Sequence, residues 1–153
     1  RTKFGAGSIL ADMKPSSAHL YKNIFAITPN LKEAADMTGV HATTNVLAER
    51  AAKTLQENFN TSIILTRGEH GITVLEKTAN VSTHFKDTLL TVHDVTGAGD
   101  TLIAVFALMH ASGAPFVEAA EVANFAAGIV VGVGGTHALT RKEFQRNYDT
   151  FTA

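Results

Sequence analysis

The chain has 153 residues, 45% of them hydrophobic and 18% charged, and its formal net charge is −1 at pH 7. This balance predicts one globular domain over residues 1–153 with a single core, and it excludes a disordered or fibrous chain. The nearly neutral charge gives no electrostatic reason to expect nucleic acid or an anionic membrane as a partner, and the absence of cysteine excludes disulfides while allowing a reducing cytoplasm.

Apolar runs bounded by turn residues predict a parallel sheet at the start of the chain. The runs 7–12 (GSILAD) and 24–28 (IFAIT) are typical of buried strands, and a helical turn is expected at 17–22 between them. Two buried strands joined by a helical crossover favour parallel pairing. A short helix is then expected from Asn30 to its closing glycine, Gly39.

The next elements are a longer helix and a hairpin. Thr44 or Asn45 is the expected cap of an amphipathic helix that ends near Asn58. The β-branched run 62–66 (SIILT) predicts a third buried strand. After it, 67–71 (RGEHG) indicates a turn and 72–76 the hairpin partner, with a weaker strand signal at 81–85.

The last third of the chain predicts three helices. The segments 101–112 and 116–131 are apolar around most of their circumference, so we expect both helices to be largely buried. An amphipathic helix from Thr140 to about Thr150 begins with the capping-box pair Thr140 and Glu143. Together the elements predict an α/β fold with a mainly parallel sheet flanked by helices.

The segment 94–100 (DVTGAGD) carries the strongest chemical signal. Small residues at 97–99 leave backbone N–H groups uncovered at a helix N-terminus, where a phosphate or a developing oxyanion is favoured. Asp100 follows and can accept a proton from an attacking hydroxyl, a pairing that phosphoryl transfer needs. The alternative is a tight glycine loop in which Asp100 only caps the helix. The segment has neither the Walker form nor the GxGxxG spacing.

Three further segments accompany it in a fixed order: TPNLKE at 28–33, LTRGEHG at 65–71 and ANFAA at 123–127. With DVTGAGD they resemble the phosphofructokinase B, or ribokinase-like, family of sugar and nucleoside kinases, and the four segments span nearly the whole chain. The resemblance implies a three-layer α/β/α fold of which this chain is the C-terminal, nucleotide-binding half. The sugar-binding N-terminal half and its lid would be absent.

The resemblance also implies a role for each motif. Asp100 would be the catalytic base, with Gly97, Ala98 and Gly99 as the anion hole. Asn30 and Glu33 would organise Mg²⁺ and the ATP phosphates through water, although their spacing satisfies a capping box equally well. The remaining nucleotide contacts would be Thr66, Arg67, Gly68, Gly71 and Asn124.

Structural alternatives exist for these nucleotide contacts. The residues 66–71 could form a hairpin turn with left-handed glycines, and Asn124 could be a buried asparagine bonded to the backbone. Glu33 is the expected Mg²⁺ residue. Asp94 and Thr96 fall where some relatives bind a monovalent cation, which makes K⁺ a further candidate ligand.

Within the family, the sequence is most similar to the heptose 7-phosphate kinases of bacterial lipopolysaccharide precursor synthesis. The similarity lies in DVTGAGDT at 94–101, in FAAGIVVGVGGT at 125–136 and in Asp12-Met13-Lys14, where those enzymes usually have Asp-Pro-Lys. It implies ATP-dependent phosphorylation of heptose 7-phosphate to the 1,7-bisphosphate. Ribose, fructose or a nucleoside as acceptor, and an inactive nucleotide-binding fragment, are the alternatives. An uncovered sheet edge would also allow copies of the chain to form a homo-oligomer.

Overall fold

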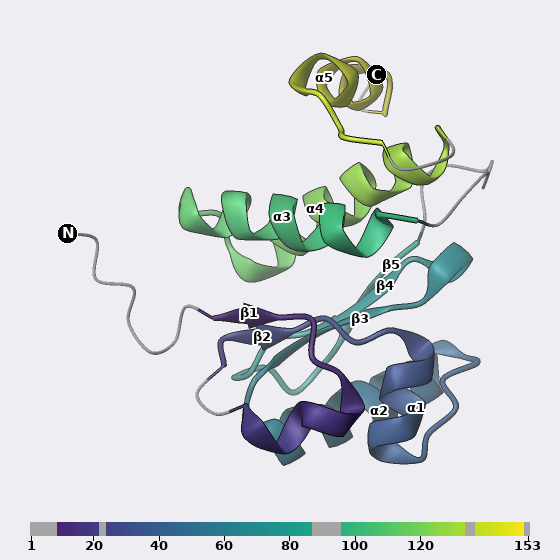
Figure 1. The fold of residues 1–153 in the computed structure, drawn as a ribbon, viewed down its shortest axis with the longest axis vertical. Coiled ribbons are helices and arrows are strands. Elements are labelled where there is room, and N and C mark those ends of the chain that lie inside the picture. Colours follow the sequence, from purple (N-terminus) through teal and green to yellow (C-terminus); the bar gives the residue numbers. More distant parts are fainter. Residues whose placement is uncertain (1–8, 22–23, 87–95, 134–136, 152–153) are drawn as a thin grey trace. The chain divides into compact units, whose positions relative to one another are not determined.

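A computed structural model describes residues 9–21, 24–86, 96–133 and 137–151 of the protein. The chain divides into two compact units, residues 1–86 and 87–153, where length and composition predicted one core. Figure 1 labels the elements of each unit.

The first unit is built on a five-stranded sheet in the order β1-β2-β3-β4-β5. The first three strands pair in parallel, as predicted, and β4 and β5 follow as antiparallel neighbours. The strand β2 is shorter than the predicted run 24–28 at both ends. The strands are β1 (Leu10–Ala11), β2 (Ala26–Ile27), β3 (Ser62–Thr66), β4 (Ile72–Leu75) and β5 (Thr83–Phe85).

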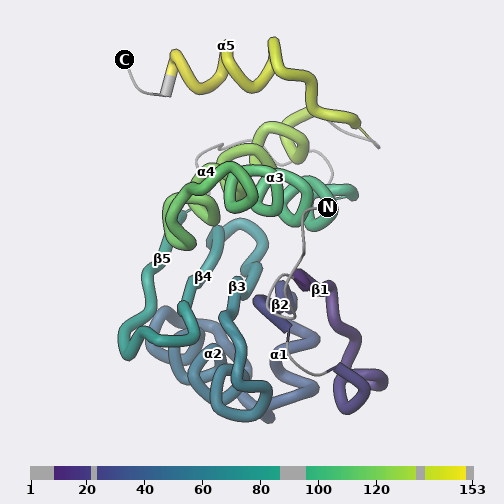
Figure 2. Tube along the Cα trace, turned by 90° about the vertical axis from the view of Figure 1, so that its left-hand side faces the viewer, coloured from purple at the N-terminus to yellow at the C-terminus, as the bar shows by residue number. Residues whose placement is uncertain are grey.

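Helices cover one face of this sheet (Figure 2). Helix α1 (Leu31–Thr38) ends at Gly39 with φ of 71°, and helix α2 (Asn45–Phe59) begins after its cap, Thr44, as predicted. The short 3₁₀ helix η1 (Pro15–Leu20) replaces the predicted turn at 17–22. The alanines and leucine of α2 recur at helical spacing and pack with the sheet in one core, which includes Ala48, Ala51, Ala52, Leu55, Ile63, Leu65 and Leu75.

In the second unit, helix α3 (Ala98–Ala111) lies beside helix α4 (Phe116–Val131). Most of α4 is buried, as predicted, but α3 buries only Leu102 and Phe106 among its residues. The prediction that α3 is largely buried is therefore wrong. The helix packs through one side, where the Phe106 ring meets Phe116 edge to face at 5.1 Å, and Leu108 on the helix remains 67% exposed.

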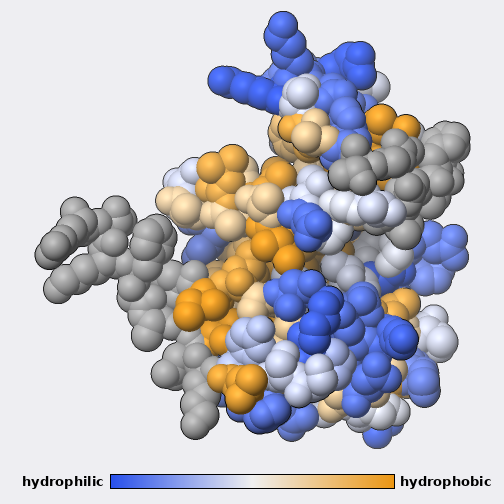
Figure 3. Space-filling view, in the orientation of Figure 1, coloured by the Kyte–Doolittle hydropathy of each residue, from blue (hydrophilic) through white to orange (hydrophobic). Residues whose placement is uncertain are grey.

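Helix α5 (Arg141–Phe151) follows the predicted capping box. The Thr140 hydroxyl accepts from the Glu143 N–H at 3.3 Å, and the Thr140 N–H donates to the Glu143 carboxylate at 2.9 Å. Phe144 and Tyr148 pack edge to face on Phe125 of α4. The side of α5 visible in Figure 3 is hydrophilic. Among the described helices, none is both long and apolar enough to cross a membrane.

Candidate active site

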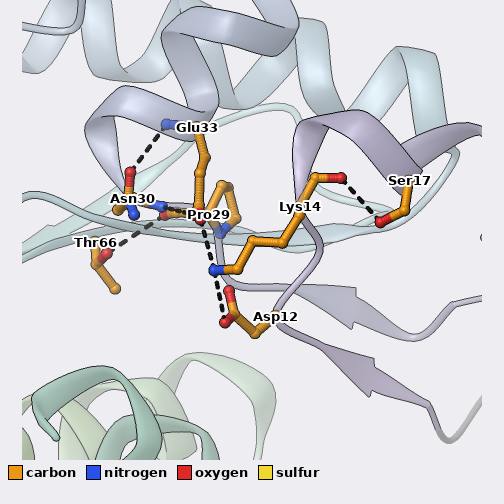
Figure 4. Close-up of polar contacts among 7 residues, drawn as sticks. All are labelled: Asp12, Lys14, Ser17, Pro29, Asn30, Glu33 and Thr66. Carbon is orange, nitrogen blue, oxygen red and sulfur yellow. Dashed lines mark hydrogen bonds and ion pairs between the residues drawn. The ribbon is translucent and has the colours of Figure 1, made fainter.

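Polar side chains of the first unit gather where its parallel strands end (Figure 4). Asp12 and Lys14 follow β1, Asn30 follows β2, and Thr66 ends β3. The backbone of Asn30 pairs with that of Thr66 as a parallel bridge, and the Thr66 N–H donates to the Pro29 carbonyl at 2.9 Å. Carboxyl ends of parallel strands are where α/β proteins bind their ligands. The structure thus brings together three predicted site residues: Asn30, Glu33 and Thr66.

Asn30 and Glu33 form the predicted capping box of α1. The Asn30 side-chain oxygen accepts from the Glu33 N–H at 2.9 Å, and the Glu33 carboxylate accepts from the Asn30 N–H at 3.0 Å. This fixes both side chains at the N-terminus of a helix, where the N–H groups favour anions. The capping box is confirmed, and the contact of this pair with a nucleotide stays a prediction.

Lys14 joins this pair and was not among the expected site residues. Its Nζ lies 2.7 Å from the free carboxylate oxygen of Glu33 and 2.9 Å from a carboxylate oxygen of Asp12. The hydrogen bonds to Glu33 and then to Asp12 raise the pKa of Lys14 above its ordinary value. The signal in the sequence was the pair of opposite charges, Asp12 and Lys14, directly after a buried strand. The contact between Lys14 and Glu33 joins two separate elements, so spacing alone could not reveal it.

The carboxylate of Glu33 has both oxygens in use, which limits how it can hold a cation. One oxygen accepts from Asn30 and the other from Lys14, and the side chain is 11% exposed. In the part of the chain that the structure describes, no group of three histidine or carboxylate side chains could hold a metal ion. The expected role of Glu33 toward Mg²⁺, through a bridging water, stays a prediction.

The segment 67–71 forms a tight turn between β3 and β4. The Arg67 N–H donates to the Gly71 carbonyl at 2.8 Å, and the Gly71 N–H donates to the Gly68 carbonyl at 2.9 Å. Gly68 and Gly71 have φ of 58° and 73°, which residues other than glycine rarely adopt. The left-handed turn is thus confirmed. Gly68 is exposed with open space where a Cβ would point, and its nucleotide contact stays a prediction.

Arg67 directs its side chain into the unit rather than outward. The residue is 5% exposed, and its Nη1 donates to the hydroxyl of Thr73 at 3.2 Å. Thr73 in turn contacts Nδ1 of His84 at 2.9 Å. The side chain of Arg67 is therefore turned away from a ligand that approaches this turn from solvent. Thr73 and His84 were not predicted as residues of this region, although the register of the β4–β5 hairpin pairs them.

In the second unit, helix α3 begins at Ala98, and not at Thr101 as predicted. Gly97 is the N-cap with φ of 84°, and the Thr101 N–H makes the first helical hydrogen bond to the Gly97 carbonyl at 2.9 Å. Asp100 thus lies within the first turn, so the alternative in which Asp100 caps the helix is wrong. The N–H groups of residues 98–100 precede the helical ladder, and the Asp100 side chain is exposed beside them.

The remaining predicted residues are placed only in part. Asn124 is buried on α4 at 7% exposure, and its contact with adenine stays a prediction. Thr96 is exposed in the turn before α3. Asp94 lies outside the described residues, so the cation site proposed for Asp94 and Thr96 stays a prediction.

The start of α3 can be tested with two alanine substitutions. We expect Gly97→Ala to lower the free energy of unfolding by about 1–2 kcal/mol, because a side chain is strained at φ of 84°. We expect Gly99→Ala to be neutral or to raise it by up to about 1 kcal/mol, because Gly99 lies within the helix with open space around its Cβ. Urea unfolding measures both values. Equal stability of the two variants would contradict the N-cap at Gly97.

Comparison with known proteins gives matches along most of the chain. The family model described as pfkB family carbohydrate kinase matches residues 4–143. The bifunctional protein HldE of Ectopseudomonas mendocina is 39% identical over 138 residues, which are 90% of this chain and 29% of that protein. This chain therefore covers less than a third of the length of that relative.

Solved structures share the fold. Phosphofructokinase-2 from Escherichia coli in complex with potassium matches with a TM-score of 0.76 and 16% identity, over 91% of this chain and 44% of that chain. Ribokinase from Arabidopsis thaliana, complexed with ribose and ATP, matches with a TM-score of 0.74 and 24% identity, over 84% of this chain and 42% of that chain. These matches confirm the predicted ribokinase-like α/β fold.

Proposed function

Because the chain belongs to the pfkB family of carbohydrate kinases, we propose that it supplies the nucleotide-binding and catalytic part of an ATP-dependent sugar kinase. The observation that carries the proposal is the start of α3, where Gly97 turns the chain at φ of 84° and Asp100 stands exposed in the first helical turn. A carboxylate beside uncovered helical N–H groups is suited to phosphoryl transfer to a hydroxyl.

In the proposed reaction, Asp100 accepts the proton of a sugar hydroxyl. The sugar oxygen forms a bond to the γ-phosphorus of ATP, and the bond from that phosphorus to the bridging oxygen of the β-phosphate breaks, which releases ADP. The N–H groups of Gly97, Ala98 and Gly99 stabilise negative charge on the transferred group. The chain thus provides the base and part of the electrostatic stabilisation.

The first unit supplies the proposed nucleotide contacts. Asn30, Glu33 and Thr66 lie together at the strand ends, and Gly68 of the turn 67–71 is exposed next to them in the chain. Mg²⁺, when bound, would neutralise charge on the β- and γ-phosphates, and Glu33 would orient it through water. Lys14 lies at the same strand ends, where it is paired with Glu33 and Asp12. The ribokinase structure with ribose and ATP, and the phosphofructokinase-2 structure with potassium, support ATP and K⁺ as ligands.

We propose heptose 7-phosphate as the acceptor. The segments 94–101 and 125–136 resemble the heptose 7-phosphate kinases, and the 39% identity with a bifunctional protein HldE supports a close relationship within the family. Phosphorylation would take place on the anomeric hydroxyl and give the 1,7-bisphosphate. The acceptor pocket would involve residues beyond those in this chain.

The acceptor is tested with a panel of sugars. The full-length protein that contains this chain is assayed with ATP, Mg²⁺ and, in separate reactions, heptose 7-phosphate, ribose, fructose and adenosine. We expect the highest kcat/KM for heptose 7-phosphate, with the new anomeric phosphate visible by phosphorus NMR. A higher kcat/KM for another acceptor would overturn heptose 7-phosphate as the acceptor and leave the proposed kinase activity in place. Nucleotide binding without turnover on any acceptor would favour an inactive nucleotide-binding protein.

A further inference from the structure

Arg67 is a buried charged residue whose role the proposed reaction does not explain. Its side chain is 5% exposed, and the group it contacts is the hydroxyl of Thr73, which is fully buried. Among the described residues, no carboxylate forms an ion pair with Arg67. Burying a guanidinium with a neutral partner costs stability, and burial lowers the pKa of Arg67. A side chain kept at such a cost calls for a specific local role.

Hydrogen bonds connect Arg67 to both strands of the hairpin. A guanidinium can only donate, so the Thr73 hydroxyl oxygen accepts from Nη1 and its own proton is available to Nδ1 of His84. A neutral His84 with Nδ1 unprotonated accepts this proton, and one with Nδ1 protonated donates to the same hydroxyl oxygen, so the contact joins β5 to Thr73 in either tautomer. Burial and the charge of Arg67 lower the pKa of His84, against a smaller opposite effect of Glu49, which favours this neutral form.

The backbone of Arg67 is part of the turn 67–71, so these hydrogen bonds connect the turn to the hairpin. Its N–H donates to the Gly71 carbonyl at 2.8 Å, and its carbonyl accepts from the His70 N–H at 3.2 Å. The turn contains Gly68 and Gly71 at positive φ, and glycine has the most conformational freedom to lose on ordering. The side chain of Arg67 therefore links this turn to Thr73 of β4 and, through Thr73, to His84 of β5.

We propose that Arg67 is a positioning residue of the nucleotide site: through Thr73 and His84 it holds the turn 67–71 in the conformation that receives the nucleotide phosphates. The inference rests on the proposed function, since it assumes that this turn contacts nucleotide. Preorganising a loop removes part of the entropy cost of binding, so a loosened turn weakens affinity even where no ligand contact is lost.

Two substitutions of Thr73 separate positioning from packing. Thr73→Val keeps the shape of the side chain and removes the hydroxyl, which leaves Arg67 without this acceptor. Thr73→Ser keeps the hydroxyl and removes a methyl group. Because Thr73 is fully buried, neither change alters a direct contact with a ligand. If Thr73 acts through packing, Thr73→Ser should lose more affinity for the nucleotide than Thr73→Val. If Thr73 positions the turn, Thr73→Val should lose more.

The closing experiment is a calorimetric titration of the wild-type chain and both variants with a non-hydrolysable ATP analogue and Mg²⁺, after circular dichroism has shown that each is folded. We expect affinity to fall about tenfold in Thr73→Val, as for the loss of a hydrogen bond to a charged group, and to stay within about threefold in Thr73→Ser. In amide NMR spectra without nucleotide, Gly68 and Gly71 should shift in the valine variant, while Gly39 at the end of α1 should not.

A folded valine variant with wild-type affinity and unshifted Gly68 and Gly71 amides would overturn the inference and leave the proposed function intact. A folded wild-type chain that does not bind the analogue would overturn both. His84→Phe provides a second variant at a half-buried position, in case the valine variant does not fold. It removes the imidazole that contacts the Thr73 hydroxyl and is expected to weaken binding of the ATP analogue about threefold. Unchanged affinity would count against the inference.

Discussion

Replacing Asp100 by asparagine is expected to lower kcat of the full-length enzyme by about 10²- to 10⁴-fold, the usual contribution of a positioned general base. Asparagine keeps the size of the side chain and the helix start at Gly97, but it cannot take the proton of the attacking hydroxyl. The affinity for ATP should therefore change little. Steady-state kinetics and a nucleotide titration on the same preparation measure the two quantities.

Glu118→Gln is the matched control for this substitution. Glu118 is also an exposed acid in the first turn of a helix in the second unit, and its substitution removes the same charge. We expect it to leave kcat within about twofold, as is usual for a surface substitution. Near-normal turnover by Asp100→Asn, or an equal loss in Glu118→Gln, would contradict the assignment of Asp100 as the base.

The second large effect is expected from Gly68→Val, which should weaken nucleotide binding by tenfold or more. Valine at φ of 58° costs at least about 1–2 kcal/mol, so the turn would move away from its present conformation. Its side chain would also occupy the open space in front of the turn, where no atom lies within 4 Å of an added Cβ. Calorimetric titration with an ATP analogue and Mg²⁺ measures the loss.

Gly39→Val separates the loss of the site from general strain. Gly39 has φ of 71°, belongs to the same unit and also has open space around an added Cβ, but it lies at the end of α1 away from the strand ends. The two variants should lose similar stability in urea unfolding, while only Gly68→Val loses affinity. A Gly68→Val chain that binds as tightly as Gly39→Val would show that the turn does not contact the nucleotide.

Local sequence signals predicted much of this structure. The capping residues Asn30, Thr44 and Thr140 each mark a helix start, since a cap bonds N–H groups only a few positions ahead. The left-handed glycines of the turn 67–71 follow from the same kind of short-range requirement. The ends of α1 and α4 were also predicted correctly, at Gly39 and near Val131.

Features that depend on distant contacts were not predicted. The start of α3 was predicted at Thr101, whereas Gly97 is its N-cap; glycine permits a positive φ at both 97 and 99, and the sequence does not tell which of them adopts it. An apolar composition all round α3 showed only that it could be buried, because burial depends on what packs against it. The side chains of Lys14 and Arg67 meet partners on other elements, at Glu33 and at Thr73.

The central claim is that this chain carries a nucleotide site. It is tested most directly by calorimetric titration of the folded wild-type chain with a non-hydrolysable ATP analogue and Mg²⁺, beside the double variant Asn30→Ala, Gly68→Val. The proposal predicts saturable binding of one nucleotide per chain by the wild type and none by the double variant. A folded wild-type chain that gives no binding heat at several temperatures, or a double variant that binds equally well, would contradict it.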